Sequence, residues 1–253
     1  MMNKLKGIGV FWVALLMVAA GNSSAAAGGI SLTVGVAANF ILPMDELIMA
    51  FTDKTSIRVH PVYSSTGKLY AQIVNGAPFD VFLAADSRRP QMLVRQKLAQ
   101  SCFLYAKGQT VLWAKRPGVL AGSDWRQAVL EPKVRRIGIA SPESAPYGEA
   151  AASALKNSDL WAKVKAKLVY GQSVAQSFMF CRQGGVDLAF VALSQALSPD
   201  GRQGEYLPVA EAPLIMQNGC ILARSKQQDA ARQFVDFLLS AAGRTIISKY
   251  GYQ

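Results

Sequence analysis

The first folded segment of the chain follows the pattern of a strand and then a helix. Between Ile30 and Val36, apolar residues alternate with small or polar ones, which is the two-residue period of a β-strand. Met44, Leu47, Ile48 and Phe51 then fall at i, i+3, i+4 and i+7, which places them on one buried face of a helix. Asn39 lies between the two patterns and is predicted to be the N-cap of this helix.

The same alternation continues through the first half of the chain. Strand-like runs cover residues 57–63 and 81–85, and a helix follows each of them, the second beginning at an Asp86 cap and continuing to residue 98. Strands that alternate with helices over short connections predict a parallel sheet with helices on both faces.

The second half restarts this pattern after a β-rich stretch at residues 102–114. Two α/β units and a C-terminal return predict an α/β fold of two lobes with a ligand between them. The strands are expected at 136–140, 168–170, 186–192, 205–209 and 220–222, and the helices at 149–155, 173–181, 229–239 and 241–249.

The N-terminal 27 residues have the layout of a secretory signal peptide. Lys4 and Lys6 precede an apolar run from Ile8 to Ala20, and Ala25-Ala26-Ala27 supplies a small-residue cleavage site. The apolar run is too short for a bilayer, which needs about 20 residues, so an uncleaved membrane anchor is the weaker reading. This segment predicts export to the periplasm.

Composition changes this picture little. The 253-residue chain is 51% hydrophobic and 17% charged, as expected for a globular protein with a core. Its formal net charge of +11 could attract nucleic acid, but the basic residues are scattered over predicted helices and no aromatic ladder accompanies them. We therefore expect no nucleic-acid binding, and a basic field that modestly speeds capture of an anion.

The cysteines and the single histidine do not make a metal site. Cys102, Cys181 and Cys220 are far apart in sequence, so an exported chain could form at most one internal disulfide with one thiol left over. His60 lies in a strand-like run and has no cysteine at zinc-ligand spacing.

Four loops share a design that suits an anion. Each follows a strand, opens a helix and is rich in small polar residues. In open parallel sheets, ligands bind beyond the carboxyl ends of the strands, where helix N-termini offer free N–H groups. The candidate ligand-binding residues are Ala38, Asn39, Ser65, Thr66, Tyr147, Ser173 and Val174.

An enzyme is less well supported than a binding protein. Ser65 or Ser173 could act as a nucleophile only beside a base, and the single histidine lies on a strand outside any G-x-S-x-G motif. The chain also lacks a G-x-x-x-x-G-K-[ST] loop and a G-x-G-x-x-G motif. We expect no catalysis, no catalytic residue and no cofactor.

Several of these segments resemble the periplasmic molybdate-binding proteins of ABC transporters. The resemblance covers essentially the whole chain after residue 27 and is most specific where S-S-T-G-K precedes G-A-P-F-D-V-F-L-A-A-D. The matching segments are 36–40, 64–73, 76–86, 147–148, 186–195 and 249–252.

The resemblance implies a type II periplasmic-binding-protein fold. Each lobe would be a mostly parallel sheet flanked by helices, with crossing strands between the lobes. Lobe I would comprise residues 28–108 plus 208–253, and lobe II residues 109–207. Ala38 with Asn39, Ser65 with Thr66, Tyr147, and Ser173 with Val174 match the four binding loops. The family often has G-S-S-G-K, so Thr66 is a departure whose extra methyl could tighten the pocket. The implied partners are molybdate or tungstate and the permease of an ABC importer, and the protein would be a monomer.

The hydrogen-bond donors of the loops restrict the class of anion that could bind. None of them offers Arg or Lys at the expected contacts, so binding would rest on neutral donors, which a full dianion can satisfy. Phosphate often carries a proton and needs an acceptor that these loops lack, at a cost of roughly 1–3 kcal/mol. Sulfate could be excluded only by size, so sulfate, thiosulfate or another small anion stays an alternative, as does a ligand-sensing module.

Overall fold

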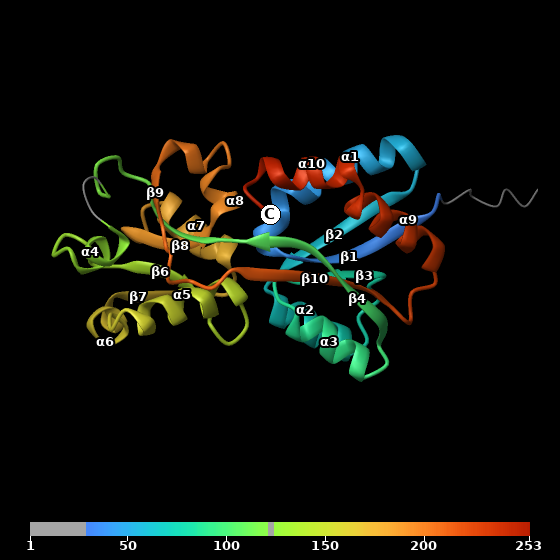
Figure 1. Ribbon diagram of the computed structural model, residues 1–253, viewed down its shortest axis with the longest axis horizontal. Helices are drawn as coiled ribbons and strands as arrows, with labels where there is room; N and C mark the ends of the chain where they lie inside the picture. The colour runs from blue at the N-terminus through green and yellow to red at the C-terminus, as the bar shows by residue number, and fades with distance from the viewer. Residues whose placement is uncertain (1–28, 121–123) are drawn as a thin grey trace, which may run out of the picture.

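Two five-stranded sheets, each with helices packed on both faces, form two lobes side by side (Figure 1). The computed structural model describes residues 29–120 and 124–253, so the predicted signal peptide at residues 1–27 lies outside the described residues. None of the helices in the described part of the chain is long and apolar enough to cross a membrane.

The first lobe is built on a sheet of order β2-β1-β3-β10-β4. Four of its strands run in the same direction, and β10 is antiparallel to both of its neighbours. The bounds are β1 (Ser31–Ala37), β2 (Arg58–Ser64), β3 (Val81–Leu83), β4 (Ala99–Gly108) and β10 (Ile215–Leu222). The helices of this lobe are η1 (Ala38–Phe40), α1 (Ile41–Thr55), α2 (Thr66–Val74), α3 (Arg88–Arg95), α9 (Gln228–Leu239) and α10 (Ala241–Lys249).

The second lobe repeats this plan with the order β7-β6-β8-β5-β9, in which β5 is the reversed strand. Its strands are β5 (Thr110–Ala114), β6 (Ile137–Ala140), β7 (Leu168–Gly171), β8 (Leu188–Ala192) and β9 (Glu205–Pro208). Its helices are α4 (Trp125–Leu130), α5 (Pro146–Asn157), α6 (Trp161–Val164), η2 (Lys165–Lys167), α7 (Val174–Arg182), α8 (Leu193–Ala196) and η3 (Gly201–Gln203).

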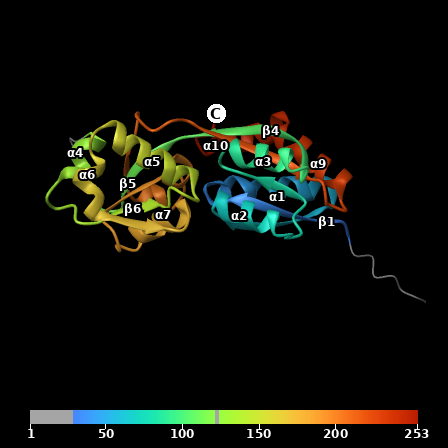
Figure 2. The same cartoon turned by 90° about the horizontal axis from the view of Figure 1, so that it is seen from below.

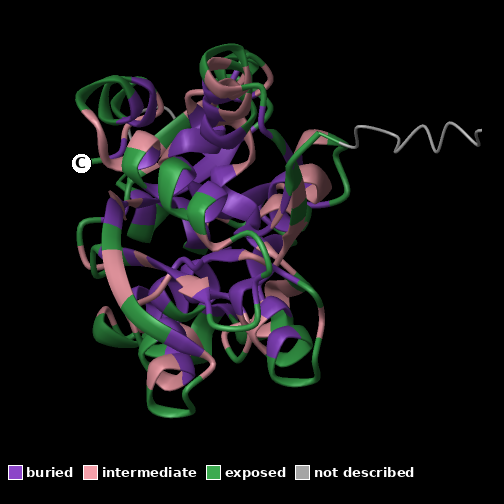
Figure 3. Ribbon diagram, turned by 90° about the vertical axis from the view of Figure 1, so that its right-hand side faces the viewer, coloured by how far each residue is buried: buried purple, intermediate pink, exposed green. Residues whose placement is uncertain are grey.

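Each sheet is buried on both faces, which explains its apolar strands. The predicted stripe of α1 packs on one face of the first sheet, where Met44, Leu47 and Phe51 are at most 1% exposed. Leu69 and Ile73 of α2 cover the opposite face. Burial of one such side chain contributes roughly 1.5–3 kcal/mol. Figure 3 shows the buried residues concentrated in the sheets and on the inward sides of the helices.

The chain passes between the lobes along two neighbouring connections (Figure 2). The first joins β4 to β5 between Gly108 and Thr110, and the second joins β9 to β10 between Pro208 and Ile215. Each connection delivers the strand that runs against the others in the sheet it enters. The crossing strands implied by the resemblance are therefore present.

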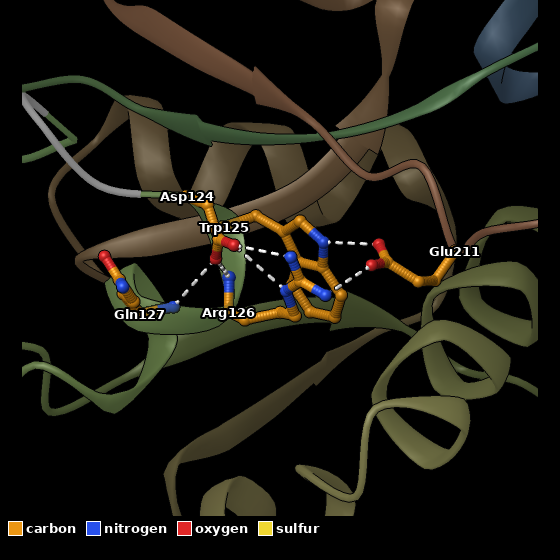
Figure 4. Close-up of polar contacts among 5 residues, drawn as sticks. All are labelled: Asp124, Trp125, Arg126, Gln127 and Glu211. Atoms are coloured by element: carbon orange, nitrogen blue, oxygen red, sulfur yellow. Dashed lines mark hydrogen bonds and ion pairs between the residues drawn. The ribbon is translucent and has the colours of Figure 1, made fainter.

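The sequence analysis did not predict α4, a helix that contacts the link between β9 and β10. Asp124 caps this helix by accepting hydrogen bonds from the backbone N–H groups of Arg126 (2.7 Å) and Gln127 (3.2 Å). The indole of Trp125 donates to Glu211 (2.6 Å), and Arg126 forms an ion pair with the same carboxylate (3.0 Å), as Figure 4 shows. Glu211 belongs to the link between β9 and β10, so α4 holds that link against the second lobe.

Candidate functional site

The seven candidate residues lie around one small cavity between the lobes. The space open to the centre of a water-sized group is about 10 Å³, far below the roughly 300–1,000 Å³ of pockets that hold drug-sized molecules, so the cavity suits only a very small ligand. Small residues let the backbone of four loops approach the centre. The lining consists of Ala37, Ala38, Asn39, Ser65, Thr66, Ala85, Ala145, Pro146, Tyr147, Ser173 and Val174.

The cavity is positioned by the carboxyl ends of strands in both sheets. Strands β1 and β2 lead into η1 and α2, and strands β6 and β7 lead into α5 and α7. The first N–H groups of a helix have no acceptor within the helix, and the helix dipole is positive at this end. Four such ends converge on the cavity, so its surroundings favour negative charge although no charged side chain is among its described lining residues.

Ser65 has the position of a helix cap without its usual contact. It is the N-cap residue of α2, yet its side chain accepts no hydrogen bond from the helix. The residue is 3% exposed, and its hydroxyl has no hydrogen-bond partner among the described residues. A buried unsatisfied hydroxyl costs about 1–3 kcal/mol. Ser65 therefore brings an unsatisfied hydroxyl to the lining of the cavity and does not act as a side-chain cap.

Tyr147 provides a second unsatisfied hydroxyl from the other lobe. It is the second residue of α5, is 2% exposed, and its hydroxyl also lacks a partner within the described part of the chain. Burial, with the neighbouring Tyr252 and Tyr105, raises the pKa of Tyr147 well above its ordinary value. The group therefore stays a neutral donor at physiological pH, which is the state an anion requires.

Thr66 and Ser173 accept backbone hydrogen bonds and keep their hydroxyl hydrogens free. The Thr66 hydroxyl accepts from the N–H of Ala85 (3.0 Å), and the Ser173 hydroxyl accepts from the N–H of Gln176 (3.3 Å) as the cap of α7. Each oxygen is thereby fixed in place while its hydrogen can still point into the cavity.

The prediction that Asn39 is a helix N-cap was wrong. Asn39 lies within the short helix η1, and the N-cap positions of η1 and α1 belong to Ala37 and Phe40. The Asn39 amide donates to the side-chain oxygen of Gln217 (2.7 Å) and to the Tyr252 hydroxyl (2.9 Å). Both hydrogens of the Asn39 amide are therefore used in hydrogen bonds within the protein.

The same network includes residues that the sequence analysis did not single out. The backbone carbonyl of Asn39 accepts from the hydroxyls of Tyr252 (2.8 Å) and Ser194 (2.9 Å), and Tyr105 donates to Gln217 (3.2 Å). These partners come from β4, β10, α8 and the C-terminus. Ser194 and Tyr252 fall in segments that carried the resemblance, but no local pattern assigned them a role. Together they fix the loop that begins η1.

The Asp86 prediction was also only partly right. Ser87, rather than Asp86, occupies the N-cap position of α3, which ends at Arg95 and not at residue 98. Asp86 accepts from the backbone N–H of Arg89 (2.8 Å) and is ion-paired with its guanidinium. Residues 99 and 100 already belong to β4, because strand pairing with β10 competes with the helix there.

Direct contacts hold the lobes together on the α2 and α3 side of the cavity. The backbone N–H of Gly67 donates to the carbonyl of Ser144 (2.8 Å), and the Arg89 guanidinium donates to the carbonyl of Glu143 (2.9 Å). Lys68 donates to the Gln172 side chain nearby. A Cβ atom at residue 67 would lie 2.9 Å from the Ser144 Cα atom. Glycine is therefore needed here for the lobes to meet.

Comparison with known proteins gives a consistent result. Residues 32–253 match the family model described as bacterial extracellular solute-binding protein. The chain is 39% identical over 239 residues to the molybdate-binding protein ModA of Azotobacter vinelandii, covering 92% of this chain and 94% of the relative. It is 37% identical over 230 residues to the ModA of Rhodobacter capsulatus, covering 90% and 89%.

A solved structure is similar over the same length. The periplasmic molybdate-binding protein of Azotobacter vinelandii superposes with a TM-score of 0.83 at 33% identity, covering 88% of this chain and 98% of that chain. The similarity spans both lobes and the cavity between them.

Proposed function

This chain belongs to the bacterial extracellular solute-binding protein family, and from that premise we propose that it captures molybdate or tungstate between its lobes for an ABC importer. The relatives at 37–39% identity are named as molybdate-binding proteins, which supports this ligand class. Export by the segment at residues 1–27 would place the protein in the periplasm, where it would meet the permease. The proposal requires neither a resident cofactor nor a catalytic step.

One observation carries the proposal. Ser65 and Tyr147 come from opposite lobes, line the same cavity, and have buried hydroxyls without a hydrogen-bond partner among the described residues. A bound tetrahedral oxyanion has acceptor oxygens that can satisfy both hydroxyls at once. Hydrogen bonds to a charged acceptor contribute about 1.5–3 kcal/mol each, and they would form only when the lobes meet around the ion.

The neutral lining favours a full dianion over phosphate. Ser, Thr and Tyr hydroxyls, helix N–H groups and apolar side chains form the described lining, without a carboxylate that could accept a proton from the ligand. Molybdate, tungstate and sulfate carry no proton at neutral pH, whereas phosphate often does. Size is then what separates sulfate from the two larger ions.

The geometry does not support a serine hydrolase. The Ser65 hydroxyl has no hydrogen-bond partner in the described part of the chain, so no base is in place to activate it. His60 lies in β2, outside the cavity lining. The Ser173 oxygen accepts the Gln176 N–H as the cap of α7, and this contact supplies no base that could take its hydrogen.

Thermal unfolding of the mature protein with molybdate, tungstate, sulfate and phosphate in turn tests the proposal. A ligand at about 100 times its dissociation constant stabilises the fold by roughly 2.7 kcal/mol. In a protein of this size that should raise the melting temperature by roughly 5–10 °C. A rise with molybdate and tungstate alone supports the proposal. A rise with sulfate alone moves the ligand to sulfate, and no rise with any of the four refutes an oxyanion.

A further inference from the structure

The fold brings two of the three cysteines together although 117 residues separate them. Cys102 of β4 and Cys220 of β10 are directly opposite in the antiparallel register of these strands. Residues opposite one another on antiparallel strands point to the same face of the sheet. From this juxtaposition we infer that Cys102 and Cys220 form a disulfide bond, which links the two strands that lead to and from the second lobe.

The backbone geometry permits this bond. Opposed residues in an antiparallel pair have Cα atoms about 4.5 or 5.5 Å apart, depending on the hydrogen-bonding position. Disulfides span Cα separations of about 4.4–6.8 Å, so either position is suitable. Both residues are free thiols in this structure.

The position of β4 gives the bond a structural purpose. β4 is one of the two edge strands of the first sheet, and β10 is its one neighbour there among the described residues. The register between β4 and β10 is irregular immediately after Cys220. A covalent link at this point would hold the edge strand in register where the ladder of hydrogen bonds is interrupted.

The third cysteine is excluded from the pair by its place in the other lobe. Cys181 lies in α7, is buried, and its sulfur contacts the backbone carbonyls of Trp113 (3.7 Å) and Asp187 (3.5 Å). Burial raises the pKa of Cys181 to about 12, which makes it a poor nucleophile. The inference therefore specifies one bond and one remaining thiol.

The oxidant is a disulfide of a thiol oxidoreductase or of oxidised glutathione, as found in oxidising export compartments; this supply rests on the proposed export. The Cys102 thiolate attacks the oxidant disulfide and releases one thiol. The Cys220 thiolate then attacks the Cys102 sulfur and releases the second thiol. Two protein thiols lose two electrons and two protons, and the oxidant disulfide is reduced to two thiols.

The chemistry places bond formation during folding. Cys220 is 0% exposed in the folded protein. Burial, together with the neighbouring Cys102, raises the pKa of Cys220 to about 12. Little thiolate is then available for the second step, so the bond should form before Cys220 is buried, and a reduced folded protein should oxidise slowly.

The test is to refold the reduced mature chain in a glutathione redox buffer near pH 8 and then alkylate it in denaturant. We expect the intact mass to show one alkylated thiol, and three after reduction. Trypsin should yield peptides 98–107 and 203–224 as a linked pair, while peptide 168–182, which contains Cys181, carries the alkyl group. Because the loop is long, the oxidised protein should melt roughly 10 °C higher than the reduced protein.

Matched variants make the result decisive. Cys181→Ala should keep the linked pair, whereas Cys102→Ser should abolish it and leave two alkylated thiols. Three alkylated thiols in the refolded wild type, a linked peptide that contains Cys181, or bonds only between molecules would overturn the inference. Thiol counting does not depend on an oxyanion, so this outcome is separate from that of the ligand titration.

Discussion

Replacement of Tyr147 by Phe tests whether the Tyr147 hydroxyl binds the ligand or stabilises the fold. The substitution removes one oxygen and keeps the ring, which is 2% exposed and part of the core beside the cavity. In the empty protein that hydroxyl lies near Tyr252 and Asn39 but meets no partner in hydrogen-bonding geometry among the described residues, so its removal breaks no well-formed hydrogen bond. The empty variant should be as stable as the wild type or more so, with a gain of at most about 1–3 kcal/mol, the penalty of an unsatisfied buried hydroxyl.

Binding should change in the opposite direction. If the hydroxyl donates to a charged oxyanion, its loss removes about 1.5–3 kcal/mol from the complex. At about 1.4 kcal/mol for each tenfold step, the dissociation constant for molybdate should rise roughly 10- to 150-fold. The empty protein would then be as stable as the wild type or more so, while its affinity for the ligand falls. Loss of a purely structural residue does not produce this combination.

Isothermal titration with molybdate and thermal unfolding without ligand measure the two quantities. Tyr170→Phe is the matched control, because it removes the same atom from a side chain that is 49% exposed and outside the cavity lining. It should leave both quantities unchanged. The reasoning is refuted if Tyr147→Phe destabilises the empty protein by more than 1 kcal/mol while its affinity stays within threefold of the wild type.

Two further predictions follow from contacts described above, and a third follows from the ion pair between Lys249 of α10 and Glu46 of α1. Gly67→Ala should weaken molybdate binding at least tenfold and also lower the melting temperature of the empty protein, because the new methyl would lie 2.9 Å from the Ser144 backbone where the lobes meet; an unchanged affinity would contradict this. Asn39→Ala should lower the urea-measured stability of the empty protein by roughly 1–3 kcal/mol as well as the affinity, since both amide donors hold the fold; loss of affinity alone would contradict it. The hydrogen bond from Lys249 holds the pKa of Glu46 below its ordinary 4.5, so this contact stabilises the fold above that pH and is lost as the pH falls through the folded pKa. Glu46→Gln should therefore flatten the decline of melting temperature below pH 4.5, and an unaltered decline would show that the contact contributes nothing.

The features that the sequence predicted are those written in local patterns. The stripe of Met44, Leu47 and Phe51 predicted α1, because a helix that buries one face has apolar residues at regular intervals. The alternation of strand-like and helix-like segments likewise predicted two α/β units. The loops after the strands likewise brought all seven candidate residues to one cavity. Their roles toward the ligand stay predictions until the ion is titrated.

What the sequence could not predict depends on partners far along the chain or on backbone atoms. Asn39 has the residue type of a cap, but its amide is engaged by Gln217, 178 residues away. The hydrogen bond between the Gly67 N–H and the Ser144 carbonyl joins two backbone groups. Every residue has such a carbonyl and every residue except proline has such an N–H, so the sequence does not mark this contact. The same limit applies to Cys102 and Cys220, whose alignment depends on the register of β4 and β10.

The exchange of one reversed strand between the sheets has a consequence for how the protein is made. The first sheet is split in two without β10, since β10 lies between β3 and β4. Its core also requires Phe234 and Ile247 from the last two helices. The N-terminal lobe therefore cannot finish folding until nearly the whole polypeptide has been synthesised. Contacts this distant in sequence form slowly. Under the proposed export, slow folding would leave the chain more time to cross a secretion channel while it is unfolded. Truncation after residue 214 should prevent even the first lobe from folding, because it removes β10.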